Sequence, residues 1–147
     1  MQATQGSIGR VFVIRLEDGD VMPDCLEQFA QEQGVKVGHA VLVGGTGGGR
    51  VVVGPRVSGA SKPDPMLLPV DGAHETLGVG VLAPDASGKP VLHMHAALGR
   101  SGQTLTGCIR PGVETWLVGE VVLYEILGAI ATRRPDPTSG FNLLQTE

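Results

Sequence analysis

The stretch that decides the fold is VLHMHAALGRSGQTLTGCI, residues 91–109. Its two halves, 91–98 and 103–109, have the aliphatic and β-branched composition of strands. Gly99, Arg100, Ser101 and Gly102 lie between them and are typical of a tight turn. We therefore predict an antiparallel hairpin with a two-residue loop at Arg100-Ser101, which would pair Gly99 with Gly102.

Two histidines give this hairpin its chemical interest. Residues two apart in a strand point to the same face, so His93 and His95 can converge on one metal ion. The predicted register places His93 opposite Cys108 and His95 opposite Thr106, which brings the thiol to the same face. A three-residue loop would instead turn Cys108 to the other face. The alternative is that the histidines are ordinary polar residues on a solvated strand.

The predicted ligand set of His93, His95 and Cys108 favours a transition metal, zinc first, with iron, nickel or copper as alternatives. Three protein ligands leave a coordination position open for water, a substrate or a fourth side chain. His74 and Glu75 are candidates for that fourth ligand, unless they form a surface pair at the start of a strand.

Glu120 lies in the apolar run LVGEVVLY. A carboxylate in such a strand is predicted either to be buried with a partner or to point at a site. If the chain is an enzyme, Glu75 and Glu120 are its candidate catalytic acids or bases.

The rest of the chain predicts an α+β fold, a mostly antiparallel sheet with one main helix packed on it. The helix is expected over 23–34, where Pro23 suits the first turn and Gly34 can end the segment. We expect residues 1–147 to form a single domain, with 131–147 as a covering segment or tail. Further strands are expected at 10–16, 39–43, 50–57, 66–70, 75–83 and 114–126.

Three further features are predicted to be structural. GGTGGG at 44–49 is expected to form a loop or a sharp, bulged bend, because a strand rather than a helix follows it and the lysine of a phosphate-binding loop is missing. His39 begins a strand and is expected to be a structural histidine. Cys25 lies on the predicted helix with no histidine beside it, which favours a small packing residue.

Composition narrows the classes of partner and compartment. The formal net charge is −4 and the sequence has no run of Lys or Arg, so nucleic-acid binding is disfavoured. No apolar stretch approaches the roughly 18 residues of a membrane span, and the N-terminus lacks the pattern of a signal peptide. A cytoplasmic location is the default expectation, and a reducing cytosol argues against a Cys25–Cys108 disulfide.

Several segments, taken in order, resemble the PPC (plants and prokaryotes conserved) domain. The segments are GRVFVIRLEDGD at 9–20, AVLVGGTGGGRVVVG at 40–54, the block 74–112, VGEVVLYEI at 118–126 and RRPDPTSGF at 133–141. The resemblance implies an antiparallel sheet with a packed helix and a homotrimer.

The resemblance also implies a metal site. Many prokaryotic members of this family join a His-x-His pair, here His93 and His95, to a third histidine. In this chain Cys108 takes the place of that histidine, which favours softer metals. Plant members carry AT-hooks in DNA-binding proteins, but no Arg-Gly-Arg-Pro hook occurs here, so that activity is not implied.

Three functions are consistent with these observations. The preferred one is a non-enzymatic, metal-binding trimer that acts as a regulatory or small-molecule-binding protein. The second is a metal-dependent enzyme that activates water at the open position. The third is a DNA-associated protein like the plant relatives. A cupin is a competing interpretation of His-x-His, but the segment 96–100 lacks the glutamate that a cupin usually has there.

Overall fold

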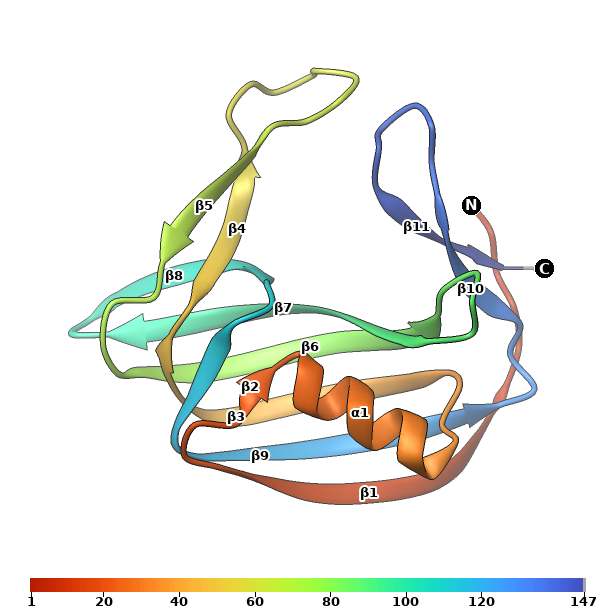
Figure 1. Ribbon diagram of the computed structural model, residues 1–147, viewed down its shortest axis with the longest axis horizontal. Helices are drawn as coiled ribbons and strands as arrows, with labels where there is room; N and C mark the ends of the chain where they lie inside the picture. The colour runs from red at the N-terminus through yellow and green to blue at the C-terminus, as the bar shows by residue number, and fades with distance from the viewer. Residues whose placement is uncertain (147) are drawn as a thin grey trace.

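A mostly antiparallel sheet with a helix on one face forms the body of the protein (Figure 1). In this computed structural model, which describes residues 1–146, the nine-stranded sheet has the order β1-β9-β3-β6-β7-β8-β4-β5, and β2 pairs with β9. A separate two-stranded sheet consists of β10 and β11. The predicted α+β arrangement is thus confirmed. The bounds are β1 Ser7–Glu17, β2 Val21–Met22, α1 Asp24–Gln33, β3 Gly38–Gly48, β4 Arg50–Pro55, β5 Pro65–Pro69, β6 His74–Pro84, β7 Pro90–Arg100, β8 Gln103–Ile109, β9 Val113–Leu127, β10 Ala131–Pro135 and β11 Asn142–Thr146.

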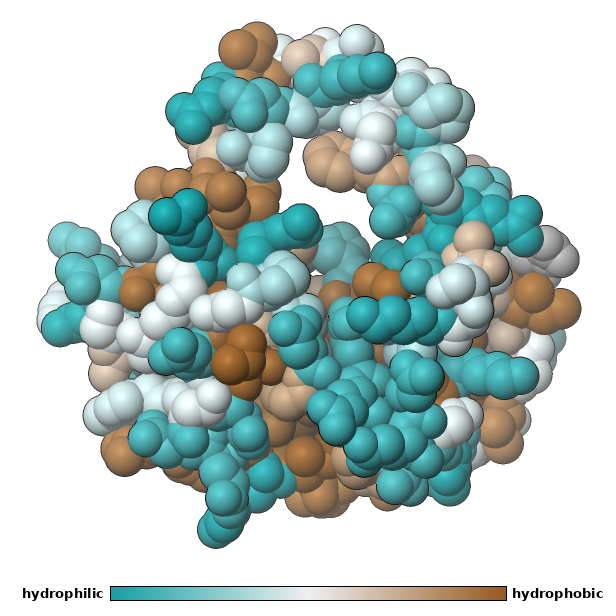
Figure 2. All heavy atoms as spheres, in the orientation of Figure 1, coloured by the Kyte–Doolittle hydropathy of each residue, from teal (hydrophilic) through white to brown (hydrophobic). Residues whose placement is uncertain are grey.

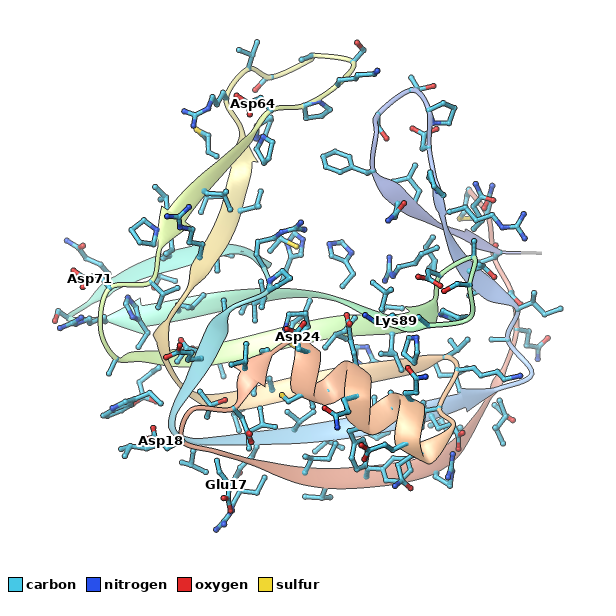
Figure 3. The ribbon with its side chains drawn as sticks, viewed as in Figure 1. Glu17, Asp18, Asp24, Asp64, Asp71 and Lys89 are labelled. Carbon is cyan, nitrogen blue, oxygen red and sulfur yellow. The ribbon has the colours of Figure 1, made fainter. Side chains whose placement is uncertain are left out.

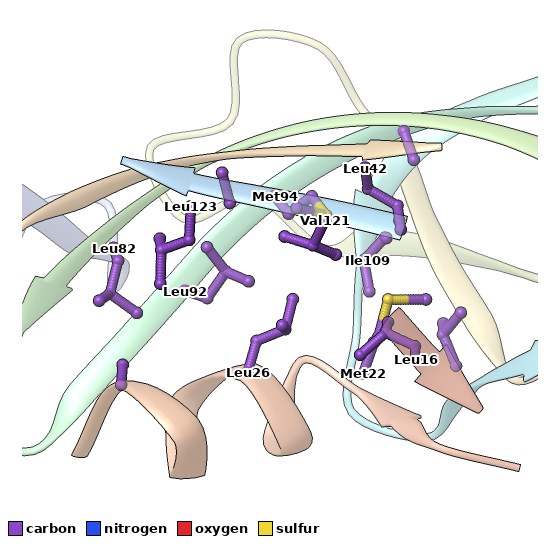
Figure 4. Close-up of a cluster of buried hydrophobic side chains, with 14 of the residues drawn as sticks. Leu16, Met22, Leu26, Leu42, Leu82, Leu92, Met94, Ile109, Val121 and Leu123 are labelled. Carbon is purple, nitrogen blue, oxygen red and sulfur yellow. The ribbon is translucent and has the colours of Figure 1, made fainter. Parts of the chain in front are cut away.

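The helix α1 closes the core against the inner face of the sheet. Pro23 precedes its first residue, and Gly34 ends it in the left-handed conformation with φ 67°, which glycine adopts without a steric penalty. Leu26 and Ala30 are buried. Figure 4 shows Leu26 pointing from α1 toward the sheet, where it joins a cluster that includes Leu92 and Val121. Burial of such a leucine contributes about 1.5–3 kcal/mol.

Strand alternation gives the sheet two different faces. Along β7, Leu92, Met94, Ala96 and Leu98 are buried on the helix side, while His93 and His95 are exposed on the other. That outer face is also rich in apolar side chains of the neighbouring strands, which no element of residues 1–146 covers. Among them, Val13 is 83% exposed and Leu77 is 66% exposed.

The glycine-rich segment 44–49 was predicted as a loop or a sharp, bulged bend. The loop was wrong, but the irregularity is present, because the register with β9 shifts between Gly44 and Gly45 and between Thr46 and Gly48. Strand β3 continues through it to Gly48 and stays paired with β6 and β9. A Cβ on Gly44 would lie 2.4 Å from the Val118 carbonyl oxygen, and one on Gly45 would lie 2.4 Å from that of Trp116. The glycines therefore permit a close approach of β9, and the strand itself ends at Gly48, before Gly49 with φ 97°.

Two hairpins project beyond the sheet on the same side and are called the two arms (Figure 1). The β4–β5 arm spans residues 50–69, and the β10–β11 arm spans residues 131–146. The second arm shows that most of the predicted covering segment or tail is a paired hairpin. Figure 2 shows an open space between the arms above the body of the molecule. No helix among residues 1–146 is long and apolar enough to cross a membrane.

Candidate metal centre

The turn between β7 and β8 sets the geometry of the site. Ser101 and Gly102 both have positive φ, 50° and 76°, as a two-residue type I′ turn requires. Arg100 consequently pairs with Gln103, and His95 pairs with Cys108. The predicted register, with the loop one residue earlier and His93 opposite Cys108, was wrong. It placed Gly102 outside the loop, although that is the position where a left-handed residue is needed.

The register error does not move Cys108 to the other face. Shifting the loop by one residue changes the partner of each residue by two positions, and side chains two apart share a face. The side chains of His93, His95 and Cys108 come together, with one ligand atom from each lying within 4.8 Å of the others. The two Nε2 atoms are 3.1 Å apart, and the imidazole planes are inclined by 79°.

The donor set fits a transition metal. In a tetrahedral zinc site, bonds of about 2.0–2.1 Å to nitrogen and about 2.3 Å to sulfur place the donors roughly 3.3–3.6 Å apart. The 3.1 Å between the two nitrogens is close to that spacing. The widest separation, 4.8 Å, requires the donors to draw together by about 1 Å. Both histidines are exposed and Cys108 is half-buried, so an ion could reach the cluster from solvent.

The surroundings of His93 favour its neutral imidazole, which is the form that binds a metal. Although His93 is exposed as a residue, partial burial of its ring lowers the pKa of this imidazole, and the charges of Arg133, His95 and Arg110 lower it further. A neutral imidazole is the form that binds a metal, so these effects reduce the competition from protons. Arg133 and Arg110 thus shape the cluster without being ligands.

The cluster lies between the bases of the two arms. On one side, Val52 of β4 pairs with Cys108. On the other, Arg133 of β10 donates a hydrogen bond of 2.8 Å to the carbonyl of Val81, which pairs with His93. Arg133 is the residue that sequence reasoning missed, because no local pattern shows that β10 returns to this point.

The other predicted site residues lie elsewhere. Glu75 pairs with Gly99, four residues along β7 from His95, which corresponds to about 13 Å. His74 adjoins it, and its Nδ1–H donates a 2.8 Å hydrogen bond to the Gly72 carbonyl. Neither His74 nor Glu75 is therefore placed to be a fourth ligand within the same chain.

Glu120 is also remote from the cluster, on β9. Three strand spacings separate β9 from β7, about 14 Å. Glu120 is exposed beside Arg15 of β1, so the prediction of a buried or site-directed carboxylate was wrong. No element of residues 1–146 covers the outer face of its strand, so within one chain the carboxylate faces solvent.

The residues expected to be structural are placed as follows. His39 stacks on Tyr124 on the outer face, with ring centroids 6.3 Å apart. Cys25 packs against the core, and burial raises the pKa of its thiol to about 11. Both cysteines are free. Among the acidic side chains of the loops, Asp64 lies on the β4–β5 arm and Asp71 at the end of the sheet away from β10 (Figure 3).

Comparison with known proteins identifies the family. Residues 3–127 match the Plants and Prokaryotes Conserved (PCC) domain family, also abbreviated PPC. The chain belongs to this family. A relative of the PPC chain, the bifunctional protein GlmU of a Synechococcus strain, is 29% identical over 140 residues. The match covers 94% of this chain and 21% of the relative, so the PPC chain spans about a fifth of that protein's length.

Solved structures share the PPC fold. A PPC protein from Pyrococcus horikoshii has a TM-score of 0.84 at 21% identity, covering 100% of this chain and 99% of that one. A metal-containing protein from Archaeoglobus fulgidus has a TM-score of 0.84 at 22% identity and covers 99% of each chain. A candidate DNA-binding protein from Bacteroides thetaiotaomicron has a TM-score of 0.79 at 17% identity, covering 96% of this chain and 97% of that one.

Proposed function

We propose that this PPC-domain protein binds a transition metal, zinc first, through His93, His95 and Cys108. The observation that carries the proposal is the convergence of two imidazole nitrogens and one thiol within 4.8 Å. The metal content named for the Archaeoglobus fulgidus relative supports it, since that protein has the same fold. Cys108 enters the site as a thiolate, so the set is softer than three imidazoles.

We infer a non-enzymatic role, as a regulatory or small-molecule-binding protein. A metal hydrolase needs an acid or base within hydrogen-bond reach of the water that it activates. Glu75 and Glu120 are about 13 Å and 14 Å away in strand geometry. The open coordination position is therefore better suited to binding a ligand than to catalysing a reaction of a substrate.

The proposed functional unit is a homotrimer. The outer face of the sheet carries Val13, Val79 and Leu77, which are exposed by 83%, 55% and 66%. Val79 pairs with His95, so the apolar face continues up to the metal cluster. A contiguous apolar face of this kind is typical of an interface, and the family resemblance favours three copies around it.

Elemental analysis of the purified protein, with three variants, tests the metal proposal. We expect close to one zinc per chain in the wild type and in Cys108→His, which restores a third imidazole. Cys108→Ala should lose about a hundredfold in affinity, because structural zinc sites gain roughly 10–16 kcal/mol from four ligands, about 3 kcal/mol from each. Cys25→Ala is the matched control, a cysteine outside the cluster, and should keep its metal.

The rival interpretation makes Cys108 a small half-buried residue that replaced a ligand no longer needed. It predicts equal metal content in the wild type and Cys108→Ala, with only a small loss of stability. That outcome would remove Cys108 from the ligand set and leave a weak two-histidine site.

A further inference from the structure

Arg133 is a buried cation held beside the candidate metal centre. Its exposed fraction is 6%. Its Nε–H donates to the Val91 carbonyl at 3.4 Å, and one Nη2–H donates to the Val81 carbonyl at 2.8 Å. Val81 pairs with His93, and Val91 precedes His93 by two residues on the same strand. The two carbonyls therefore fix the guanidinium next to one of the proposed ligands.

The remaining N–H donors of the Arg133 guanidinium have no hydrogen-bond partner among residues 1–146. A guanidinium has five N–H donors, and two of them are used. The ion pairs in this part of the chain are Arg10–Glu125, Arg15–Glu17 and Arg56–Asp64, none of which involves Arg133. A buried charge is normally paired.

The unpartnered Nη1 group of Arg133 is not fully buried. Among residues 1–146, the side-chain atoms that are both buried and without a hydrogen-bond partner belong to Thr115 and Thr146. The Nη1 atom of Arg133, which has no partner, must then reach solvent. The end-on edge formed by Nη1 and the second N–H of Nη2 presents two parallel donors, the geometry that matches a carboxylate or phosphate.

Two arginines, Arg133 and Arg110, place positive charge beside the cluster. Burial lowers the pKa of Arg133, while the charges of Cys108 and Glu27 raise it, which indicates that the thiolate lies within the field of the guanidinium. One oxygen of the Glu27 carboxylate accepts a hydrogen bond of 2.9 Å from the Leu92 N–H, and the carboxylate remains a negative charge near Arg133. Arg110 adds a second positive charge near His93. A divalent ion held by a single thiolate would leave this region with a net positive charge even with Glu27 counted.

We propose that the centre takes a small oxyanion, a carboxylate or a phosphate, with one oxygen on the metal and the others on the free edge of Arg133. This inference rests on the proposed metal site and names the ligand class of its open position. The open space between the arms, at whose base the cluster lies, is the route by which such an anion would enter (Figure 2).

The test uses cobalt(II)-loaded protein and follows the visible absorption of the ion during titration. Acetate and inorganic phosphate are the probes, and acetamide is the neutral counterpart of acetate. We expect saturable spectral change with an oxyanion and none with acetamide at the same concentration. The two titrations also distinguish the two classes of ligand. A carboxylate site responds at a lower concentration of acetate, and a phosphate site responds at a lower concentration of phosphate.

Variants assign the effect to Arg133. Arg133→Lys keeps the charge but loses the two-donor edge, and it should bind the oxyanion about tenfold more weakly or worse. Arg15→Gln, on β1 across the sheet, is the control and should bind like the wild type. If Arg133→Lys does not fold, the exposed Arg110→Gln decides by weakening binding several-fold.

Each outcome bears on a different claim. A wild type that takes up no cobalt would overturn the proposed metal site and this inference together. Full cobalt uptake with no oxyanion response, with an equal response to acetamide, or with Arg133→Lys and Arg110→Gln both equal to Arg15→Gln, would overturn the oxyanion site alone.

Discussion

The ion pair between Arg10 and Glu125 should make a large, pH-dependent contribution to the stability of the fold. Arg10 donates to the Glu125 carboxylate from Nε at 2.7 Å, from Nη2 at 2.8 Å and from its main-chain N–H at 3.1 Å. A further bond of 2.9 Å to the Gln33 carbonyl ties β1 and β9 to the end of α1. Glu125→Gln removes the charge and leaves donors of Arg10 facing an amide.

The size of this contribution depends on the burial of the Glu125 side chain, which is 9% exposed, and on the exposure of the Arg10 side chain. Hydrogen bonds to a charged group contribute about 1.5–3 kcal/mol each, but the Arg10 side chain is 51% exposed, so solvent screens the pair. We expect Glu125→Gln to lower the free energy of unfolding by about 2 kcal/mol at pH 7, which corresponds to a Tm lower by roughly 4–8 °C. Glu17→Gln, from an exposed pair with 70% and 71% exposure, should cost about 0.5 kcal/mol or less.

The pH dependence gives the sharper test. The hydrogen bonds from Arg10 hold the pKa of Glu125 at about 2, below the ordinary value of about 4.3. A carboxyl whose pKa is depressed on folding stabilises the fold above its unfolded pKa, and this contribution is lost as pH falls through the folded pKa. The difference between wild type and Glu125→Gln should therefore close between about pH 4.5 and pH 2.

Urea denaturation of metal-free protein at one fixed concentration, from pH 7 down to pH 2.5, measures this difference. Chelation removes the coupling to metal, and a fixed concentration removes the coupling to self-association. The reasoning would be refuted by a loss at pH 7 no larger than that of Glu17→Gln. It would also be refuted by a difference that stays constant down to pH 2.5.

Three further outcomes are expected. Val79→Asp, which puts a charge on the outer face, should lower the mass measured by light scattering without changing the circular dichroism, whereas Val57→Asp in the exposed β4–β5 loop should leave the mass unchanged. A monomeric wild type at micromolar concentration would contradict the trimer. Iodoacetamide should label Cys108 faster than Cys25, because burial raises the pKa of the Cys25 thiol to about 11, and zinc should protect Cys108 from labelling. Preferential labelling of Cys25 would count against the burial of Cys25 and against the metal site at Cys108. Duplex DNA should not be retarded by the pure protein at physiological salt, given the net charge of −4, whereas tight, salt-sensitive retardation would show that a basic surface had been overlooked.

Local sequence was enough to place the three proposed ligands on one face. Strand alternation puts His93 and His95 on the same side, and any two-residue loop at this turn keeps Cys108 with them, because side-chain direction depends only on the parity of the register. Which residues pair depends on backbone torsion angles at Ser101 and Gly102, and the composition of the turn alone did not specify them.

The glycines of 44–49 show the opposite case. Their number predicted a flexible bend, since glycine is the most permissive residue. In the fold, Gly44 and Gly45 are required because β9 passes within 2.4 Å of where their Cβ atoms would be. That contact joins residues about 70 positions apart, and no local pattern encodes it.

What the sequence by itself determined, then, is the alternation of faces, the one helix and the residue types able to hold a metal, because each depends on neighbours within a few positions. Only the tertiary structure decided that Glu75 and Glu120 lie far from the cluster and that Arg133 lies beside it. The bonds from Arg133 reach carbonyls 42 and 52 residues away in sequence. Contacts at such separations arise from the order of strands in the sheet and the return of the β10–β11 arm, which are properties of the packed chain.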